Sequence, residues 1–207
     1  RYHLEVPIPF YSGITAKIQH GGLSHILSRY RSLSFAYLNR RARMRQTDFL
    51  DVGKAESEKA HGYACTGQST VRTARSHPEG DFFETVWTED GRYHEGGAIR
   101  FAVAVDPNNQ GVRLRRRLDQ EVPCQGARVF VDGTEAGTWY WGYRNEHLRW
   151  YEQDFDLAGE LTAGKSTLAL RLELLPQTNI RIPESSAKLL HPAVTFTDLS
   201  YTVFCFE

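Results

Sequence analysis

The chain has 207 residues, of which 41% are hydrophobic, so it can bury a sizeable core and lacks the composition of a disordered protein. Lys plus Arg and Asp plus Glu both number 25, and the formal net charge of zero offers no overall attraction to nucleic acid or an anionic membrane surface. No apolar run approaches the roughly 18 residues that a membrane-spanning helix requires.

The first 50 residues predict the closing strands of a β domain. Residues 14–20 and 33–37 alternate apolar and polar side chains, as strands with one buried face do, and Gly21-Gly22 separates them. Residues 4–10 contain Pro7 and Pro9, which fit an edge strand or a strand end. Residues 39–46 are basic and predict a surface stretch. We therefore assign residues 1–50 to the end of a first jelly roll.

A single short helix is predicted over residues 54–61, where helix-forming residues are dense and Gly62 provides a stop. This helix lies in a predicted linker, residues 51–67. The linker joins the first piece to a second jelly roll, which we assign to residues 68–207.

The remaining sequence repeats a pattern of strand, turn and strand. Residues 99–105 alternate apolar and other side chains, and residues 106–111 have the Pro, Asn and Gly content of a turn. The pair Asp132-Gly133 predicts a hairpin between strands at 127–131 and 138–141. Four leucines at alternate positions of 168–174 predict a late strand with one buried face, and residues 194–206 supply the last strand or two.

These elements predict an all-β fold. We count eight or nine strands after residue 67 with almost no helix between them, whereas parallel strands need long crossover connections. The sequence therefore predicts an antiparallel jelly roll or β-sandwich, in a tandem arrangement whose first jelly roll is incomplete in this chain.

Several catalytic classes lack their motifs. There is no phosphate-binding glycine-rich loop after a strand, no Gly-x-Ser-x-Gly and no His-Glu-x-x-His, which excludes nucleotide-dependent enzymes, serine hydrolases and zinc proteases of those types. Cys65, Cys124 and Cys205 are far apart and lack the spacing of a zinc site, so we interpret them as buried or unreactive thiols. One disulfide remains open as an alternative if the protein is exported. We predict no metal site.

Aromatic side chains are concentrated between residues 139 and 151. Trp139 and Trp141 share one face of a predicted strand, and Trp150 follows soon after. Aromatic rings can pack on the C–H groups of a sugar while neighbouring polar side chains bind its hydroxyls. This pattern makes the three tryptophans candidate sugar-binding residues. The alternative interpretation is that their rings cap the core of the sandwich or fill a subunit interface.

Charged residues offer two further hypotheses. A retaining glycosidase needs two carboxyl groups about 5 Å apart, and spacing along strands does not identify which acids converge. The candidates are Glu5, Glu84, Glu89, Asp90, Glu95 and Glu146. Arg113, Arg115 and Arg117 lie on one side of a predicted strand. We interpret them as a solvated face or as ion-pair partners of acids on the next strand, and we expect no nucleic-acid partner.

The order of several short segments resembles glycoside hydrolase family 172. Residues 1–10, with the sequence Arg-Tyr-His-Leu-Glu-Val-Pro-Ile-Pro-Phe, are similar to the Tyr-Arg-Trp-His-x-x-Asp-Pro-Ile-x-Phe stretch of that family. Residues 18–21 and 30–37 resemble its Glu-His-Gly and Tyr-Ser-Ser-Val-Ala-Tyr-Trp-Tyr segments, and residues 111–116, 129–133 and 137–140 are similar to its second half. The resemblance covers most of the chain.

This resemblance implies a double jelly roll that assembles as trimers or dimers of trimers. It also implies cleavage or transfer of furanosides, such as α-fructofuranosides or D-arabinofuranosides, with retention at the anomeric carbon, by two glutamates and without a cofactor. Arg1 and His3 would be pocket-side residues, and Glu5 belongs with them as a third substrate-binding candidate of the opening segment.

Two departures from the family pattern limit the transfer of activity. Val6 stands where the family has Asp, and the Gly-Thr-x-x-Glu-Asp-Tyr-Phe motif associated with the nucleophile is missing, Thr88-Glu89-Asp90 being followed by Gly91-Arg92. We expect the chain to be the C-terminal portion of a longer product, with the nucleophile upstream or on a second polypeptide. The catalytic residues are thus unidentified, and whether the chain alone is an enzyme stays open.

Two other functions remain as alternatives, namely a non-catalytic carbohydrate-binding sandwich and a structural jelly-roll protein of an assembly. The sequence starts with Arg1 and contains no signal-peptide pattern, and it leaves both cytoplasmic and secreted locations open.

Overall fold

The computed structural model describes residues 43–76, 86–142, 144–145, 148–176 and 194–207. Its elements are β1 (Met44–Asp51), α1 (Ala55–Ala60), β2 (Ala64–Thr66), β3 (Ser69–Ser76), β4 (Trp87–His94), β5 (Ala98–Ala104), β6 (Gly111–Asp119), β7 (Gln125–Val131), β8 (Thr134–Trp141), β9 (Trp150–Ala158), α2 (Gly159–Thr162), β10 (Thr167–Leu174), β11 (Phe196–Asp198) and β12 (Ser200–Phe206).

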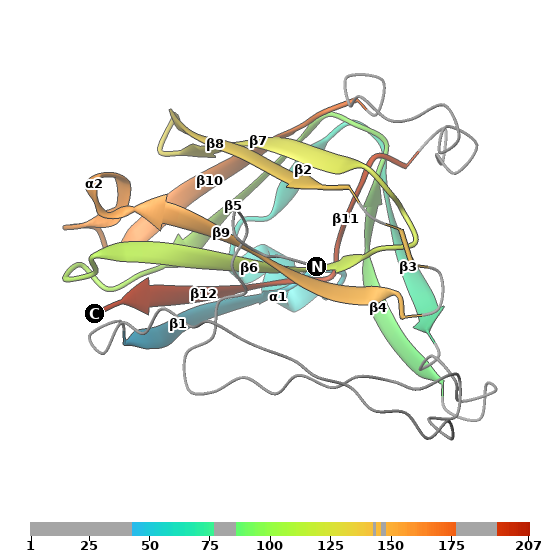
Figure 1. Cartoon of the computed structure of the whole chain (residues 1–207), viewed down its shortest axis with the longest axis horizontal. Helices are drawn as coiled ribbons and strands as arrows, with labels where there is room; N and C mark the ends of the chain where they lie inside the picture. Colours follow the sequence, from blue (N-terminus) through green and yellow to red (C-terminus); the bar gives the residue numbers. More distant parts are fainter. Residues whose placement is uncertain (1–42, 77–85, 143, 146–147, 177–193) are drawn as a thin grey trace, which may run out of the picture.

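The strands form three sheets (Figure 1). Sheet A has the order β1-β12-β6-β9, sheet B has the order β2-β5-β10-β7-β8, and sheet C has the order β11-β4-β3. Every strand pairing within the described residues is antiparallel. The predicted all-β antiparallel sandwich is therefore confirmed.

Sheets A and B face each other across the main hydrophobic core. The residues predicted to alternate do so, since Ile99, Phe101 and Val103 of β5 are at most 3% exposed while Ala98 and Arg100 point outward. The four leucines of β10 are also buried, and they face the apolar side chains of β6 and β12. This burial of alternate side chains on both sheets provides most of the driving force that holds the two layers together.

One guanidinium lies inside this apolar layer. Arg116 of β6 is fully buried, with its Cζ atom 3.9 Å from the centroid of the Phe196 ring and 5.3 Å from that of Trp139. Its Nη2 donates a hydrogen bond to Oε1 of Gln153 at 3.0 Å. Burial lowers the pKa of Arg116 to about 10, so the side chain still carries a charge at neutral pH.

The two turns predicted from their residues are present. Asp132 and Gly133 both have positive φ angles, 49° and 88°, as a tight hairpin between β7 and β8 requires. In the turn after β5, the amide of Asn108 donates to the Asp106 carboxylate at 2.9 Å and the amide of Asn109 donates to the Asp106 carbonyl at 3.1 Å. Local residue chemistry therefore determines both connections.

The helices and the start of the sandwich differ in part from expectation. Helix α1 falls inside the predicted range 54–61, whereas the single turn α2 was not predicted. Strand β1 begins within the predicted basic stretch and pairs with β12 from Met44–Phe206 to Asp51–Ser200, and β2 pairs with β5. The sandwich therefore includes residues 44–66 and starts before the predicted boundary at residue 68. The strands predicted within residues 1–38 lie outside the described residues.

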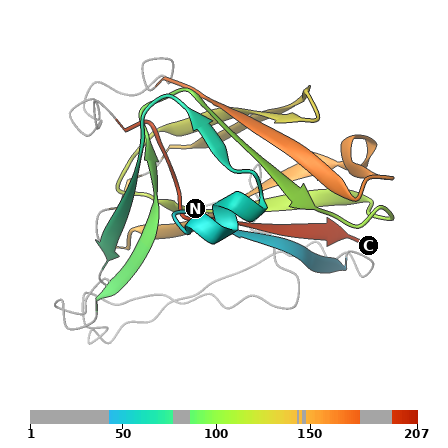
Figure 2. The same ribbon diagram turned by 180° about the vertical axis from the view of Figure 1, so that it is seen from behind.

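Sheet C lies at one end of the sandwich, where its strands run across the direction of β6 and β12 (Figures 1 and 2). Glu58 of α1 fastens this sheet, because its carboxylate accepts bonds from Arg92 Nε at 2.6 Å and Arg92 Nη2 at 2.7 Å. It also accepts a bond from the Gly53 amide at 2.8 Å. Burial alone would raise the pKa of Glu58, but Arg92 and the Gly53 amide lower it below its ordinary value.

Replacing Glu58 with Gln should lower the free energy of unfolding by about 1.5–3 kcal/mol, the usual contribution of hydrogen bonds to a charged group. Because the pKa is lowered in the folded state, the carboxylate stabilises the fold above the unfolded pKa of about 4.3 and loses this effect as the pH falls through the folded pKa. The difference between wild type and Glu58→Gln in urea unfolding should therefore shrink from about pH 6 to about pH 3.

The matched control is Glu135→Gln, which removes the exposed pair with Arg128 and should change stability little. A difference for Glu58→Gln that does not depend on pH would contradict the role given to the Glu58–Arg92 pair.

Candidate functional site

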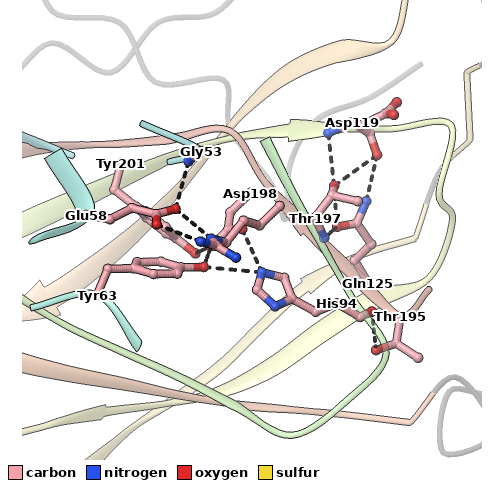
Figure 3. Close-up of polar contacts among 11 residues, drawn as sticks. Gly53, Glu58, Tyr63, His94, Asp119, Gln125, Thr195, Thr197, Asp198 and Tyr201 are labelled. Carbon is pink, nitrogen blue, oxygen red and sulfur yellow. Dashed lines mark hydrogen bonds and ion pairs between the residues drawn. The ribbon is translucent and has the colours of Figure 1, made fainter. Parts of the chain in front are cut away.

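A buried polar cluster joins sheet C to the sandwich (Figure 3). Asp198 of β11 binds His94 of β4, with 2.8 Å between Oδ1 and Nε2, and accepts hydroxyl bonds from Tyr63 at 2.9 Å and Tyr201 at 3.0 Å. Burial is the main cause, and the neighbouring Asp198 carboxylate the second, that raises the pKa of each tyrosine well above the ordinary value for a phenol. Both phenols therefore remain protonated donors.

Thr197, the residue before Asp198 in β11, makes buried hydrogen bonds on the opposite side of the strand. The Thr197 amide donates to Oε1 of Gln125 at 2.8 Å, and the Asp119 amide donates to Oγ1 of Thr197 at 3.0 Å (Figure 3). The Asp119 carboxylate accepts a bond from the Tyr93 hydroxyl at 2.6 Å and another from Arg149 Nε at 3.0 Å. These contacts fix the ends of β4, β6 and β9 relative to one another.

Paired histidine and aspartate side chains can serve acid–base catalysis, but this pair is enclosed. The His94 side chain is 1% exposed and that of Asp198 is 0% exposed, so a substrate does not reach either group in this structure. The cluster therefore satisfies buried polar groups and joins the sheets, and we do not assign it as the functional site.

The arginines of β6 form a ladder of ion pairs with β9, as one of the two interpretations predicted. Arg113 contacts Asp156 at 2.5 Å, Arg115 contacts Asp154 at 2.7 Å, and Arg117 contacts Glu152 at 3.4 Å. The side-chain hydrogen bond with Asp154 is the main cause that raises the pKa of Arg115. Since acids of the neighbouring strand neutralise these cations, the run provides no site for a polyanion.

An open groove of about 600 Å³ lies where sheet C meets β6 and β9. Its lining residues are Val86, Trp87, Thr88, Glu89, Arg117, Leu148 and Trp150. Trp87 is 43% exposed and stands with Leu148 and Val86, which are also exposed, so the groove offers an apolar aromatic surface to solvent. Trp150 is 6% exposed and packs below this surface in a second apolar cluster with Tyr93 and Leu199.

Strand pairing and hydrogen bonds from backbone amides to side chains hold the two sides of the groove in place. Trp87 pairs with Ser76 in sheet C, and Oγ of Ser76 accepts a bond from the Arg149 amide at 3.0 Å. The Leu148 amide donates to Oδ1 of Asn145 at 3.1 Å. The segment that carries Leu148 and Trp150 is thereby fixed to the strand that leads to Trp87.

The two charged residues that line the groove, Glu89 and Arg117, form one connected set with the neighbouring Glu152. Arg117 Nε donates to Oε2 of Glu89 at 2.6 Å, Arg117 Nη2 donates to Oε1 of the same carboxylate, and Arg117 Nη1 donates to Oε1 of Glu152 at 3.4 Å. The side-chain bond with Glu89 is the main cause that raises the pKa of Arg117. The carboxylates of Glu89 and Glu152 are 32% and 48% exposed, so the set is accessible to a ligand.

The predicted aromatic residues do not share one surface. Trp139 is 2% exposed and packs on Phe155 at 5.4 Å between ring centroids, as the core-capping alternative predicted, and its ring is not available to a sugar. Trp141 stacks on Tyr151 at 4.1 Å, which closes the edge of the sandwich between β8 and β9. Of the three candidates, only Trp150 lines the groove.

The remaining candidates have different outcomes. Arg1, His3 and Glu5 lie outside the described residues, as do Glu84 and Glu146 among the carboxylates considered. Glu89 is part of the groove, whereas Trp87, Leu148 and Arg117 were not predicted as site residues. A sequence signal existed for Trp87, because it is a large apolar residue at the start of a strand rich in charged side chains.

Comparisons with known proteins give only distant structural similarity. No protein-family model matches the chain, and no curated protein matches it. A carbohydrate-binding module of Cellvibrio mixtus lichenase 5A, solved in complex with cellotriose, has 8% identity and a TM-score of 0.45, with 77% of this chain and 97% of that chain covered.

Two further solved structures show the same level of similarity. A family 35 carbohydrate-binding module from an environmental isolate has 14% identity and a TM-score of 0.43, covering 77% of this chain and 96% of that chain. An exo-β-1,3-galactanase of Phanerochaete chrysosporium has 12% identity and a TM-score of 0.40, and the match covers 69% of this chain and 27% of that chain. None of these TM-scores reaches 0.5, so we draw no functional conclusion from them.

Within the ranges that the structure describes, no helix has the length and apolar character needed to cross a membrane.

The different positions of the tryptophans predict different effects of their removal. Trp139→Ala should lower the free energy of unfolding by about 3–5 kcal/mol because it leaves a cavity in the core. Trp87→Ala should change it by no more than about 0.5 kcal/mol because the side chain lies at the surface, 43% exposed, and outside the main core. Urea denaturation followed by circular dichroism measures both, and equal losses would contradict the assignment of Trp87 to the surface.

Proposed function

We propose that this chain binds carbohydrate in the groove lined by Trp87, Glu89 and Arg117. The observation that carries the proposal is the exposed indole of Trp87 beside the accessible Arg117–Glu89 ion pair in one open groove. A sugar ring needs both features, because its C–H groups pack on an aromatic face and its hydroxyls require donors and acceptors at the ring edge.

The size and composition of the groove agree with a ligand of this class. Its volume of about 600 Å³ lies in the range of small-molecule sites. Trp87, Leu148 and Val86 provide the apolar surface, and charged side chains occur only at Glu89 and Arg117 among the lining residues described. A purely apolar ligand would leave these charges without solvent, whereas hydroxyl groups can replace the lost water.

The same contacts favour binding over cleavage by the described groove alone. Both carboxylate oxygens of Glu89 are engaged by Arg117, and Glu152 contacts the same guanidinium. A glycosidase needs one carboxyl group that is free to attack or to donate a proton. Glu89 would have to break its ion pair to take either role.

Trp87→Ala should weaken the binding of a neutral oligosaccharide identified on a glycan array by about tenfold or more, since about 1.4 kcal/mol of stacking corresponds to that factor. Isothermal titration calorimetry gives the dissociation constants. The matched control is Phe49→Ala, which removes another exposed aromatic side chain, from β1, and should leave affinity unchanged. If wild type binds no oligosaccharide, or Trp87→Ala binds as tightly as wild type, the proposal is wrong.

A finer proposal is that the chain forms part of a retaining glycosidase or transglycosylase acting on fructofuranosides or arabinofuranosides. It is supported by the ordered sequence resemblance over residues 1–37 and 111–140. Under this proposal the protein assembles as a trimer or hexamer. The nucleophile comes from residues upstream of residue 1 or from a second polypeptide.

The full gene product should then release sugar from aryl α-fructofuranosides or α-D-arabinofuranosides and retain the anomeric configuration, as nuclear magnetic resonance of the first product would report. Light scattering of the same sample measures the number of subunits. Absence of turnover together with a Gly-Thr-x-x-Glu-Asp motif missing from the gene would exclude the furanosidase proposal and leave sugar binding unaffected.

A further inference from the structure

We infer that the groove selects neutral sugars that present two adjacent hydroxyl groups, and that the Arg117–Glu89 pair is the determinant of this selection. The inference rests on the proposed sugar-binding function and specifies the class of ligand. It follows from the number of donors and acceptors at the pair and from the balance of charge around it.

The pair offers a donor and an acceptor side by side. The bonds from Arg117 to Glu89 and Glu152 use three of the five N–H donors of its guanidinium, so two donors remain after its bonds to the described residues. Each oxygen of Glu89 accepts one bond from Arg117 and can accept a second one. Of two adjacent hydroxyls, one can therefore accept a bond from Arg117 while its neighbour donates to Glu89.

The strands hold this arrangement rigidly. Glu89 lies opposite Ala74 in the pairing of β3 with β4, and Arg117 lies between Ser200 of β12 and Glu152 of β9. Both backbones are thus fixed by hydrogen-bonded neighbours. The two-point contact between guanidinium and carboxylate then sets the spacing of the polar groups that a ligand meets.

The charges disfavour an acidic sugar. Arg117 is the single cation among the described lining residues, and it lies between the carboxylates of Glu89 and Glu152. The nearby Arg149 is also engaged by acids, since it contacts Glu121 at 2.7 Å and binds Asp119. The charges of Arg117, Glu89 and Glu152 sum to −1. The carboxylate of a uronic acid would therefore face repulsion, with no unpaired cation among the described lining residues to offset it.

The test compares matched pairs of ligands with wild-type protein at low ionic strength. Neutral gluco-, galacto- and xylo-oligosaccharides are titrated beside glucuronate and galacturonate oligosaccharides of equal length. We expect the best neutral ligand to bind about tenfold or more tightly than its uronate counterpart, with the difference decreasing as salt screens the repulsion. Equal or tighter binding of the uronate overturns the inference even when sugar binding itself is confirmed.

Two variants assign the selectivity to named residues. Glu152→Gln, which removes one negative charge, should reduce the ratio of neutral to uronate affinity severalfold. Glu89→Ala, which removes the acceptor, should abolish the difference between the best neutral sugar and its deoxy analogue lacking the hydroxyl that donates to Glu89. Wild type should show that difference at about tenfold or more.

The control variant is Glu135→Gln, which breaks the exposed Arg128–Glu135 pair of sheet B and should alter neither ratio. A deoxy analogue that binds wild type as well as the parent sugar overturns the role of Arg117 and Glu89. If no sugar of either set binds wild type, the proposed function itself fails and the inference falls with it.

Discussion

The burial of β11 is the constraint on which the end of the molecule that carries the groove depends. All three residues of this strand are fully buried, and its two polar side chains point to opposite sides. Asp198 joins His94 and two tyrosines, whereas Thr197 joins Gln125 and Asp119. Because a buried carboxylate is costly unless it is bound by donors, these partners have to be present for sheet C to dock. Docking in turn brings Trp87 and Glu89 of β4 against the sandwich.

Arg117 connects the stability of the sandwich with the character of the groove. It is the last arginine of the β6 ladder, in which the acids of β9 neutralise each cation in turn. At this last position a residue of sheet C, Glu89, adds a second acid. The charge that a ligand meets is therefore a consequence of how the two sheets meet, and not of a separate loop built for recognition.

Local patterns allowed most of the fold to be predicted from the sequence, but not the site. The alternation in β5 and β10, the turn at Asp132-Gly133 and the helix near residue 58 depend on neighbouring residues, and all three are present. Alternation does not reveal whether a face meets a second sheet or solvent, so the sequence left open whether Trp139 faces a sugar or caps the core, and the ring is enclosed in the core. Glu89 and Arg117 are 28 positions apart, and their contact depends on the docking of sheet C, which has no local signal.

The four tryptophans also give the molecule an optical property. Trp139 and Trp150 are almost completely enclosed and Trp141 is partly covered by Tyr151, so Trp87, at 43% exposed, has the most solvent-accessible indole of the four. Its fluorescence emission should be shifted to longer wavelength than that of the other three. Because Trp87 lines the groove, a ligand that binds there should change this emission, and no attached dye is needed to follow it.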